Sequence, residues 1–267
     1  MTVTQRIAAT LLLAFLITTP GFAATPPPDL PPCPSAEQEP DIAALIRRVE
    51  YSQEGLSSIA TIRMNIQTET WSRSLRMRIW SKGRDYALIR ILEGGPREIG
   101  MMTLKREKQL WNYLPQAERV MRLPSGMMGD SWMGSDFTND DLVGGTSMVD
   151  DFTYELVGTL THDDREAWHI RLTPKASATM VWERIEIVVD RETCVPLVQR
   201  FYDDDGEVAR TMTFSDIRTI GWRHFPGRIS VKPEDTERET VIVYESIEFD
   251  VDIPDATFSL HRLQQGR

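Results

Sequence analysis

A sustained alternation of apolar and polar side chains is the feature that most limits what this chain can fold into. From about residue 59 onwards the hydrophobic period is two: Ile62, Met64 and Ile66 alternate with polar neighbours, and the pattern returns at 75–79. Side chains on a strand point alternately to opposite faces, so this period predicts half-buried β-strands. Further predicted strands are 86–92, 98–105, 109–114, 119–123, 152–161, 166–173, 182–190, 196–202, 207–219, 225–232 and 239–249.

Short turns separate these predicted strands, and almost no helical pattern lies between them. The turn segments at 82–83, 94–96, 163–165 and 203–206 are rich in Gly, Asp and Pro, which favour tight turns. The chain is therefore predicted to be mainly β, as an antiparallel meander. About thirteen strands are too many for a flat open sheet, so we expect the sheet to curl into a barrel or half-barrel with an interior.

One long segment, residues 124–151, interrupts the strands. Residues 138–141 (Thr-Asn-Asp-Asp) are typical of a capping box that opens a short helix. Methionine suits surfaces that accept irregular apolar ligands, but the same side chains can simply fill a large core. Both interpretations stay open, and we expect this segment to plug the barrel mouth. Its apolar side chains cluster: Met127, Met128, Trp132, Met133 and Phe137.

The N-terminal residues are predicted to direct export. Residues 1–23 carry one charge, Arg6, followed by an apolar run and small residues before a cut near Ala23, which is typical of a secretory signal peptide. We therefore expect a periplasmic protein of the Gram-negative type without a permanent membrane anchor. The predicted organisation is a signal peptide at 1–23, a Pro-rich linker at 24–40 and a single domain at 41–267, which opens with a helix capped by Asp41.

Charge excludes some partners. The 40 Asp and Glu against 30 Lys and Arg give a net charge of −10, which argues against binding nucleic acid. The same balance disfavours permanent adhesion to an anionic bilayer, although a local basic patch can dock there briefly. The two cysteines, Cys33 and Cys194, can form a disulfide in an oxidising compartment, but the position of Cys33 in the linker leaves this pairing open.

Signatures of catalysis and of cofactor binding are missing from the sequence. No Gly-x-Ser-x-Gly, Ser-x-x-Lys or His-Glu-x-x-His motif occurs, and the four histidines lie on separate segments without metal-ligand spacing. The acidic run at 203–207 is explained by a hairpin tip. We therefore predict a protein that is not an enzyme and binds no metal or other cofactor.

Four segments together resemble a known family: 110–115 (LWNYLP), 119–124 (RVMRLP), 131–142 (SWMGSDFTNDDL) and the ending 247–260. This looks like the outer-membrane lipoprotein-sorting group of proteins related to the periplasmic carrier LolA, over residues 42–263. The segment 131–142 is the most specific part. The resemblance implies an unclosed, strongly curved antiparallel β-barrel, with helices that cover an apolar cavity for the acyl chains of lipoproteins or related lipids.

The resemblance also implies where ligand and partners bind. An inner-membrane permease of the RND or ABC type is implied as a partner by analogy. The lid elements are expected to be the helix at 41–57 and the segment 124–145. The residues expected to line the cavity or its lid are Trp111, Tyr113, Met127, Met128, Trp132, Met133 and Phe137.

Two functions fit this sequence. The first is a periplasmic carrier that shields acyl chains and delivers them toward the outer membrane, because about 0.8 kcal/mol per buried methylene makes free diffusion of such chains costly. The alternative is a sensor on the same fold that binds lipid or protein and signals through a membrane partner. The sequence decides neither the cargo nor the oligomeric state.

Overall fold

The computed structural model of the chain describes residues 25–35, 38–143, 147–178, 181–234 and 236–265. The predicted signal peptide at 1–23 lies outside these described residues. Over the described ranges, no helix combines the length and the apolar character that crossing a membrane requires.

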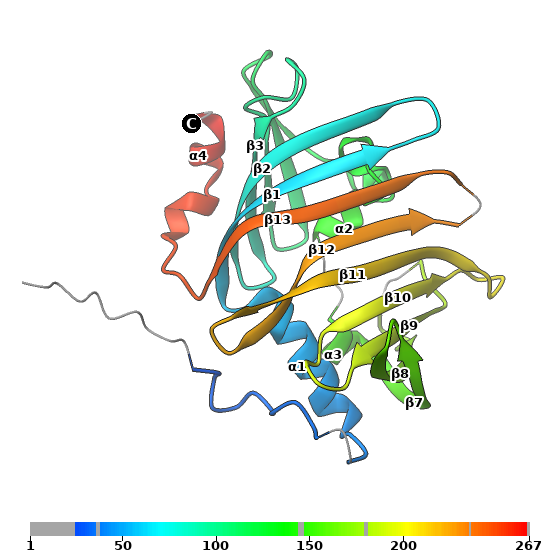
Figure 1. The fold of residues 1–267 in the computed structure, drawn as a ribbon. Coiled ribbons are helices and arrows are strands. Elements are labelled where there is room, and N and C mark those ends of the chain that lie inside the picture. The colour runs from blue at the N-terminus through cyan, green and yellow to red at the C-terminus, as the bar shows by residue number, and fades with distance from the viewer. Residues whose placement is uncertain (1–24, 36–37, 144–146, 179–180, 235, 266–267) are drawn as a thin grey trace, which may run out of the picture.

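A single sheet of thirteen strands dominates the molecule (Figure 1). All its pairings are antiparallel, in the order β6-β5-β4-β3-β2-β1-β13-β12-β11-β10-β9-β8-β7, so the two halves of the chain join where β1 meets β13. The strongly curved sheet leaves β6 and β7 as edges, and the barrel is unclosed. The predicted mainly β, half-barrel fold is confirmed. The strands are β1 (Ser57–Gln67), β2 (Ser72–Lys82), β3 (Tyr86–Glu93), β4 (Met102–Arg106), β5 (Gln109–Leu114), β6 (Arg119–Arg122), β7 (Phe152–His162), β8 (Arg165–Pro174), β9 (Arg184–Asp190), β10 (Pro196–Tyr202), β11 (Val208–Ile220), β12 (Arg223–Pro233) and β13 (Glu239–Phe249).

Apart from the thirteen-residue α1, the helices of the described residues are short. The predicted caps are present: Asp41 accepts a hydrogen bond from the Ala44 amide, and Thr138 and Asp141 bond each other's backbone amides at 3.1 and 2.7 Å. The helices are α1 (Ile42–Glu54), η1 (Ser125–Met127), η2 (Trp132–Gly134), α2 (Asn139–Val143), α3 (Met148–Asp151), η3 (Asp255–Phe258) and α4 (Leu260–Gln264).

Apolar side chains are buried on both faces of the sheet. On the concave face α1 packs against the C-terminal half-sheet through Leu45, Ile46 and Val49, each with no exposed surface. On the outer face of β3–β5, the C-terminal segment 251–263 covers a second buried cluster. The molecule therefore has two packed layers, one on each face of the sheet.

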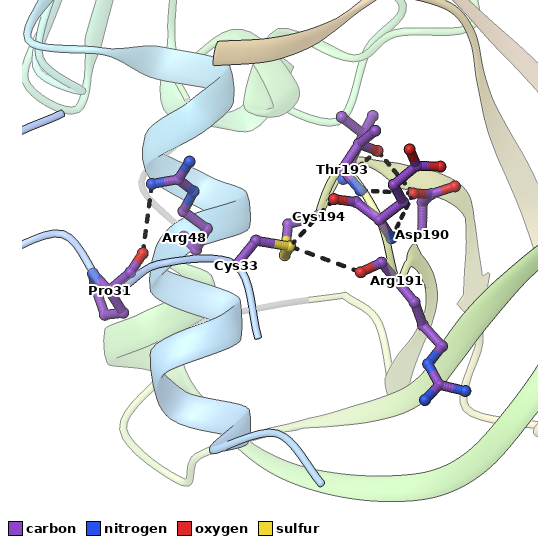
Figure 2. The surroundings of a disulfide bond; sticks show 9 residues. Pro31, Cys33, Arg48, Asp190, Arg191, Thr193 and Cys194 are labelled. Atoms are coloured by element: carbon purple, nitrogen blue, oxygen red, sulfur yellow. Dashed lines mark hydrogen bonds between the residues drawn. A yellow bond between two sulfur atoms is a disulfide. The ribbon is translucent and has the colours of Figure 1, made fainter. Parts of the chain in front are cut away.

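A disulfide ties the Pro-rich segment to the domain. Cys33 is bonded to Cys194, with their Cα atoms 5.9 Å apart, and the Arg48 guanidinium on α1 donates to the Pro31 carbonyl at 3.4 Å (Figure 2). The pairing that the sequence left open is therefore formed in the structure. The sequence predicted only a linker that precedes the domain, whereas the structure bonds this segment to the domain at Cys194 and at α1.

Asp190 organises the turn that carries Cys194. Its Oδ1 accepts hydrogen bonds from the Glu192 and Thr193 amides at 2.9 and 2.7 Å, and its Oδ2 bonds Arg165 at 2.8 Å. Burial alone raises the pKa of Asp190, but the bonds from Arg165 and Thr193 outweigh it and hold the pKa below its ordinary value of 3.8. Asp190 is therefore a charged, fully bonded anchor for this turn.

Acidification is expected to cost stability through Asp190. A carboxyl whose pKa is lower in the folded than in the unfolded state contributes stability above its unfolded pKa, and the contribution is lost as the pH falls through the folded pKa. The Tm should therefore decrease when the pH is lowered below about 4. Thermal unfolding of Asp190→Asn should show a shallower fall with acid than the parent protein. An equal slope in both proteins would contradict this role.

Candidate functional site

A cavity of about 440 Å³ lies between the concave face of the sheet, α1 and the segment 131–142. This volume is in the range of small-molecule sites in proteins. Both half-sheets contribute apolar side chains, so the cavity exists only because β1 pairs with β13 and brings the halves together. Its apolar lining comprises Ile62, Ile79, Ile89, Trp132, Phe137, Leu142, Met148, Phe152, Val181, Trp182, Ile185, Phe201, Met212 and Ile242.

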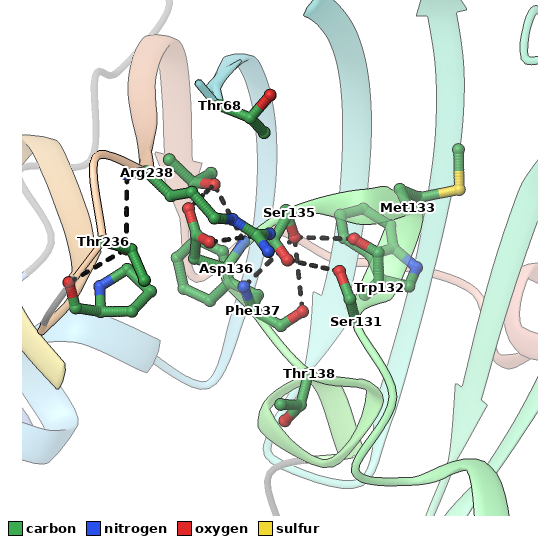
Figure 3. Close-up of polar contacts among 12 residues, drawn as sticks. Thr68, Ser131, Trp132, Met133, Ser135, Asp136, Phe137, Thr138, Thr236 and Arg238 are labelled. Carbon is green, nitrogen blue, oxygen red and sulfur yellow. Dashed lines mark hydrogen bonds and ion pairs between the residues drawn. The ribbon is translucent and has the colours of Figure 1, made fainter. Parts of the chain in front are cut away.

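The segment 131–142 forms one wall of the cavity and is fixed to the sheet by polar contacts (Figure 3). The Asp136 amide donates to Oγ1 of Thr240 on β13 at 2.9 Å, and that hydroxyl donates to the Asp136 carboxylate at 2.7 Å. Arg238 reaches the other carboxylate oxygen at 3.0 Å. At the far end, Arg73 of β2 donates to the Met133 carbonyl. These bonds hold the wall over the apolar interior.

A buried ion pair fixes the C-terminal end of the segment 131–142 to the sheet. Both Nη atoms of Arg210 on β11 bond the two oxygens of Asp141 on α2, at 2.8 and 2.7 Å. The Arg210 side chain is 7% exposed, and its guanidinium stacks 4.3 Å from the Phe201 ring and 4.8 Å from the Trp182 ring. Burial raises the pKa of Asp141, but Arg210 and Thr138 outweigh it and keep the pKa below its ordinary value.

One rim of the cavity is charged. Arg84, in the β2–β3 turn, lies 2.9 Å from Glu50 and 3.2 Å from Glu54 of α1. Lys105 of β4 is 8% exposed, and its pKa is lowered by burial, which the carboxylate of Glu54 partly offsets. The cavity thus has an apolar interior and a polar rim, an arrangement suited to an amphiphile.

Two of the predicted site residues line the cavity. Trp132 and Phe137 are both on its wall, and Trp132 is 5% exposed because it also packs among the core residues of β1–β3. Its ring Nε1 donates to Thr103 at 3.4 Å. Met133 packs against the same core without lining the cavity, Met127 is 43% exposed at the surface, and Met128 is half-buried outside it.

Trp111 and Tyr113 lie on the other face of the sheet, so their predicted place in the cavity is corrected. They pair with Leu104 and Met102, which belong to the outer cluster. That cluster is buried under Phe258 and the rest of the C-terminal segment. Alternation predicts that the two aromatic residues share a face, but it cannot tell which face is inside when both are apolar.

Sequence reasoning missed most of the C-terminal contribution to the site. Trp182, Phe201, Arg210 and Met212 line the cavity from β10, β11 and the segment before β9. The sequence signal was an arginine within an apolar alternation on β11, since a buried guanidinium needs a carboxylate partner. No group of three or more His, Cys, Asp or Glu among the described residues is arranged to hold a metal ion.

Comparison with known proteins places the chain in a family. A family model for uncharacterized proteins matches residues 83–265, more than half of the chain. The chain belongs to this family. No curated protein matches it in sequence.

Solved structures share the fold of this family member. A DUF1329 family protein from Desulfovibrio piger is similar with a TM-score of 0.75 and 24% identity, over 83% of this chain and 97% of that one. A putative outer membrane lipoprotein-sorting protein domain from Vibrio parahaemolyticus gives 0.71 and 18%, over 83% and 97%. A LolA superfamily protein from Nitrosomonas europaea gives 0.67 and 17%, over 82% and 97%. The predicted resemblance to LolA-like proteins is confirmed in the fold.

Proposed function

We propose that this protein is a periplasmic carrier that binds the acyl chains of lipoproteins or related lipids in the cavity and delivers them toward the outer membrane. The observation that supports it is the cavity of about 440 Å³, whose lining is mostly aliphatic and aromatic. Burying a methylene group there gains about 0.8 kcal/mol, so an acyl chain is the ligand for which this lining is most favourable.

The charges around the cavity and the disulfide also agree with this role. Among the described residues that line the cavity, the charged side chains are ion-paired with one another and no nucleophile lies beside a base, in agreement with the proposed non-catalytic role. A disulfide is typical of an oxidising compartment such as the periplasm. A membrane permease of the RND or ABC type is the proposed source or acceptor of the ligand.

A substitution that places a charge in the cavity wall tests this function. Phe137→Glu puts an unpaired carboxylate beside the bound chain, which costs several kcal/mol, so affinity for a fluorescent fatty acid should fall by about 100-fold or more. Phe137 is the better position than Trp132 because it is half-buried, and its replacement disturbs the core less. Fluorescence titration gives the affinities.

The matched control is Met121→Glu. Met121 is 52% exposed on β6 and does not line the cavity, so the same chemical change there should leave fatty-acid affinity unchanged. Unchanged binding by Phe137→Glu would refute the cavity as the ligand site. If ligand binds but is never passed to acceptor vesicles or to a permease, the sensor alternative is favoured over the carrier.

A further inference from the structure

Arginines gather on the outer face of the central strands. Ile62, Ile79 and Ile89 point into the cavity, so alternation sends their neighbours along each strand to the outer face. The strands β3, β2, β1, β13 and β12 lie side by side in this order (Figure 1). We call the following five arginines on these strands the arginine patch: Arg63 on β1, Arg76 and Arg78 on β2, Arg90 on β3 and Arg228 on β12.

The strand register sets the arginine patch in two rows. In the first row Arg76 faces Arg63, and Val243 separates Arg63 from Arg228. In the second row Arg78 on β2 directly faces Arg90 on β3. Like charges directly opposite each other across two strands are destabilising. The Arg78–Arg90 pair therefore has no benefit for the stability of the sheet.

Two glutamates neutralise only part of the patch. Glu93 lies 3.4 Å from Arg63 and 3.2 Å from Arg76, and Glu245 lies 3.0 and 2.6 Å from the same two guanidinium groups. Both carboxylates are thus shared between Arg63 and Arg76. Each is held in place by two cations, so neither carboxylate offsets the charge of the second row.

The remaining arginines lack a carboxylate. In the part of the chain that the structure describes, no ion pair is formed by Arg78, Arg90 or Arg228. The guanidinium of Arg78 instead lies 5.3 Å from the ring centre of Trp80, on the same face. The charge is also regional, because residues 57–123 hold thirteen Lys and Arg against six Asp and Glu in a chain of net charge −10.

We propose that the arginine patch is a docking surface for an anionic phospholipid bilayer. Guanidinium groups bind phosphate oxygens in pairs, and basic side chains near an anionic surface are attracted to it. Since the rest of the acidic molecule is repelled, docking is reversible and restricted to this face.

The proposal goes beyond the carrier function and needs no cargo. The arginine patch lies on the opposite face of the sheet from the cavity, so a docked molecule keeps its cavity lining uncovered by the bilayer. Docking can therefore be measured with the cavity empty.

Vesicle sedimentation tests the docking. The purified protein should sediment with vesicles of about 30% phosphatidylglycerol in phosphatidylcholine at about 0.05 M salt, and should stay in solution with pure phosphatidylcholine or at about 0.5 M salt. The double variant Arg78→Glu/Arg90→Glu should lower the bound fraction by about fivefold or more. Arg90→Glu alone should also bind less while its Tm stays equal or rises, because a carboxylate then faces Arg78.

The matched control carries the same charge change elsewhere. Arg47→Glu/Lys232→Glu replaces two exposed cations outside the arginine patch and should bind vesicles nearly as well as the parent protein. Equal loss in this control, or unchanged binding by Arg78→Glu/Arg90→Glu, would overturn the proposal. So would binding of the parent protein to a poly-glutamate peptide but not to the anionic vesicles, because the patch would then serve an acidic protein.

The outcome is separable from that of the carrier proposal. Arg78→Glu/Arg90→Glu should keep its affinity for a fluorescent fatty acid, whereas Phe137→Glu should lose that affinity and still sediment with anionic vesicles. Loss of both activities in both variants would contradict two separate surfaces.

Discussion

Asp141→Ala is expected to lower the free energy of unfolding by about 3 kcal/mol, because it leaves a buried guanidinium without its carboxylate. Arg210 is 7% exposed and stacks against Phe201 and Trp182, so its charge has little access to water when Asp141 is absent. The same change releases α2 from β11, and with it one end of the wall that covers the cavity. Urea unfolding of the purified variant gives the difference.

A double variant provides the control for this ion pair. Asp141→Leu/Arg210→Met removes both charges with side chains of suitable size, and replacing a buried pair in this way is often neutral or stabilising. It should recover most of the stability lost in Asp141→Ala. If the free energy of unfolding of Asp141→Ala lies within about 0.5 kcal/mol of that of the parent protein, the ion pair is solvated and does not hold the cavity wall.

Removing the disulfide is expected to cost about 2–5 kcal/mol. The bond joins residues that are 161 positions apart, so its loss restores the freedom of a very long loop in the unfolded chain. Cys33→Ala/Cys194→Ala should therefore unfold at a clearly lower urea concentration. Alanine is preferred to serine at position 194, because the site has no exposed surface and would bury a hydroxyl.

Reduction of the parent protein is the matching control for the disulfide. Dithiothreitol should lower the unfolding midpoint of the parent protein and leave that of Cys33→Ala/Cys194→Ala unchanged. We expect the double variant to keep its β-sheet circular dichroism, because the sheet contacts do not depend on residues 25–40. If Cys33→Ala/Cys194→Ala had the same unfolding midpoint as the oxidised parent protein, the disulfide would add no stability.

Local sequence patterns determined the strands and the caps. The period of two fixes which residues of each strand share a face, so Ile62 and Met64 are separated from Arg63 whatever the tertiary structure is. The capping pairs at Asp41 and at Thr138–Asp141 need only residues within one turn. The number of strands also implied curvature, because an open sheet of this width does not stay flat.

The tertiary structure decided which face became the inside. Trp111 and Tyr113 form an apolar row as convincing as that of Ile79 or Ile89, yet the C-terminal segment covers their face and leaves the other to the cavity. The partner of Arg210 lies 69 positions away, and that of Cys33 161 positions away. Periodicity describes neighbours along the chain, whereas a cavity is set by which distant segments cover each face, and that depends on long-range packing.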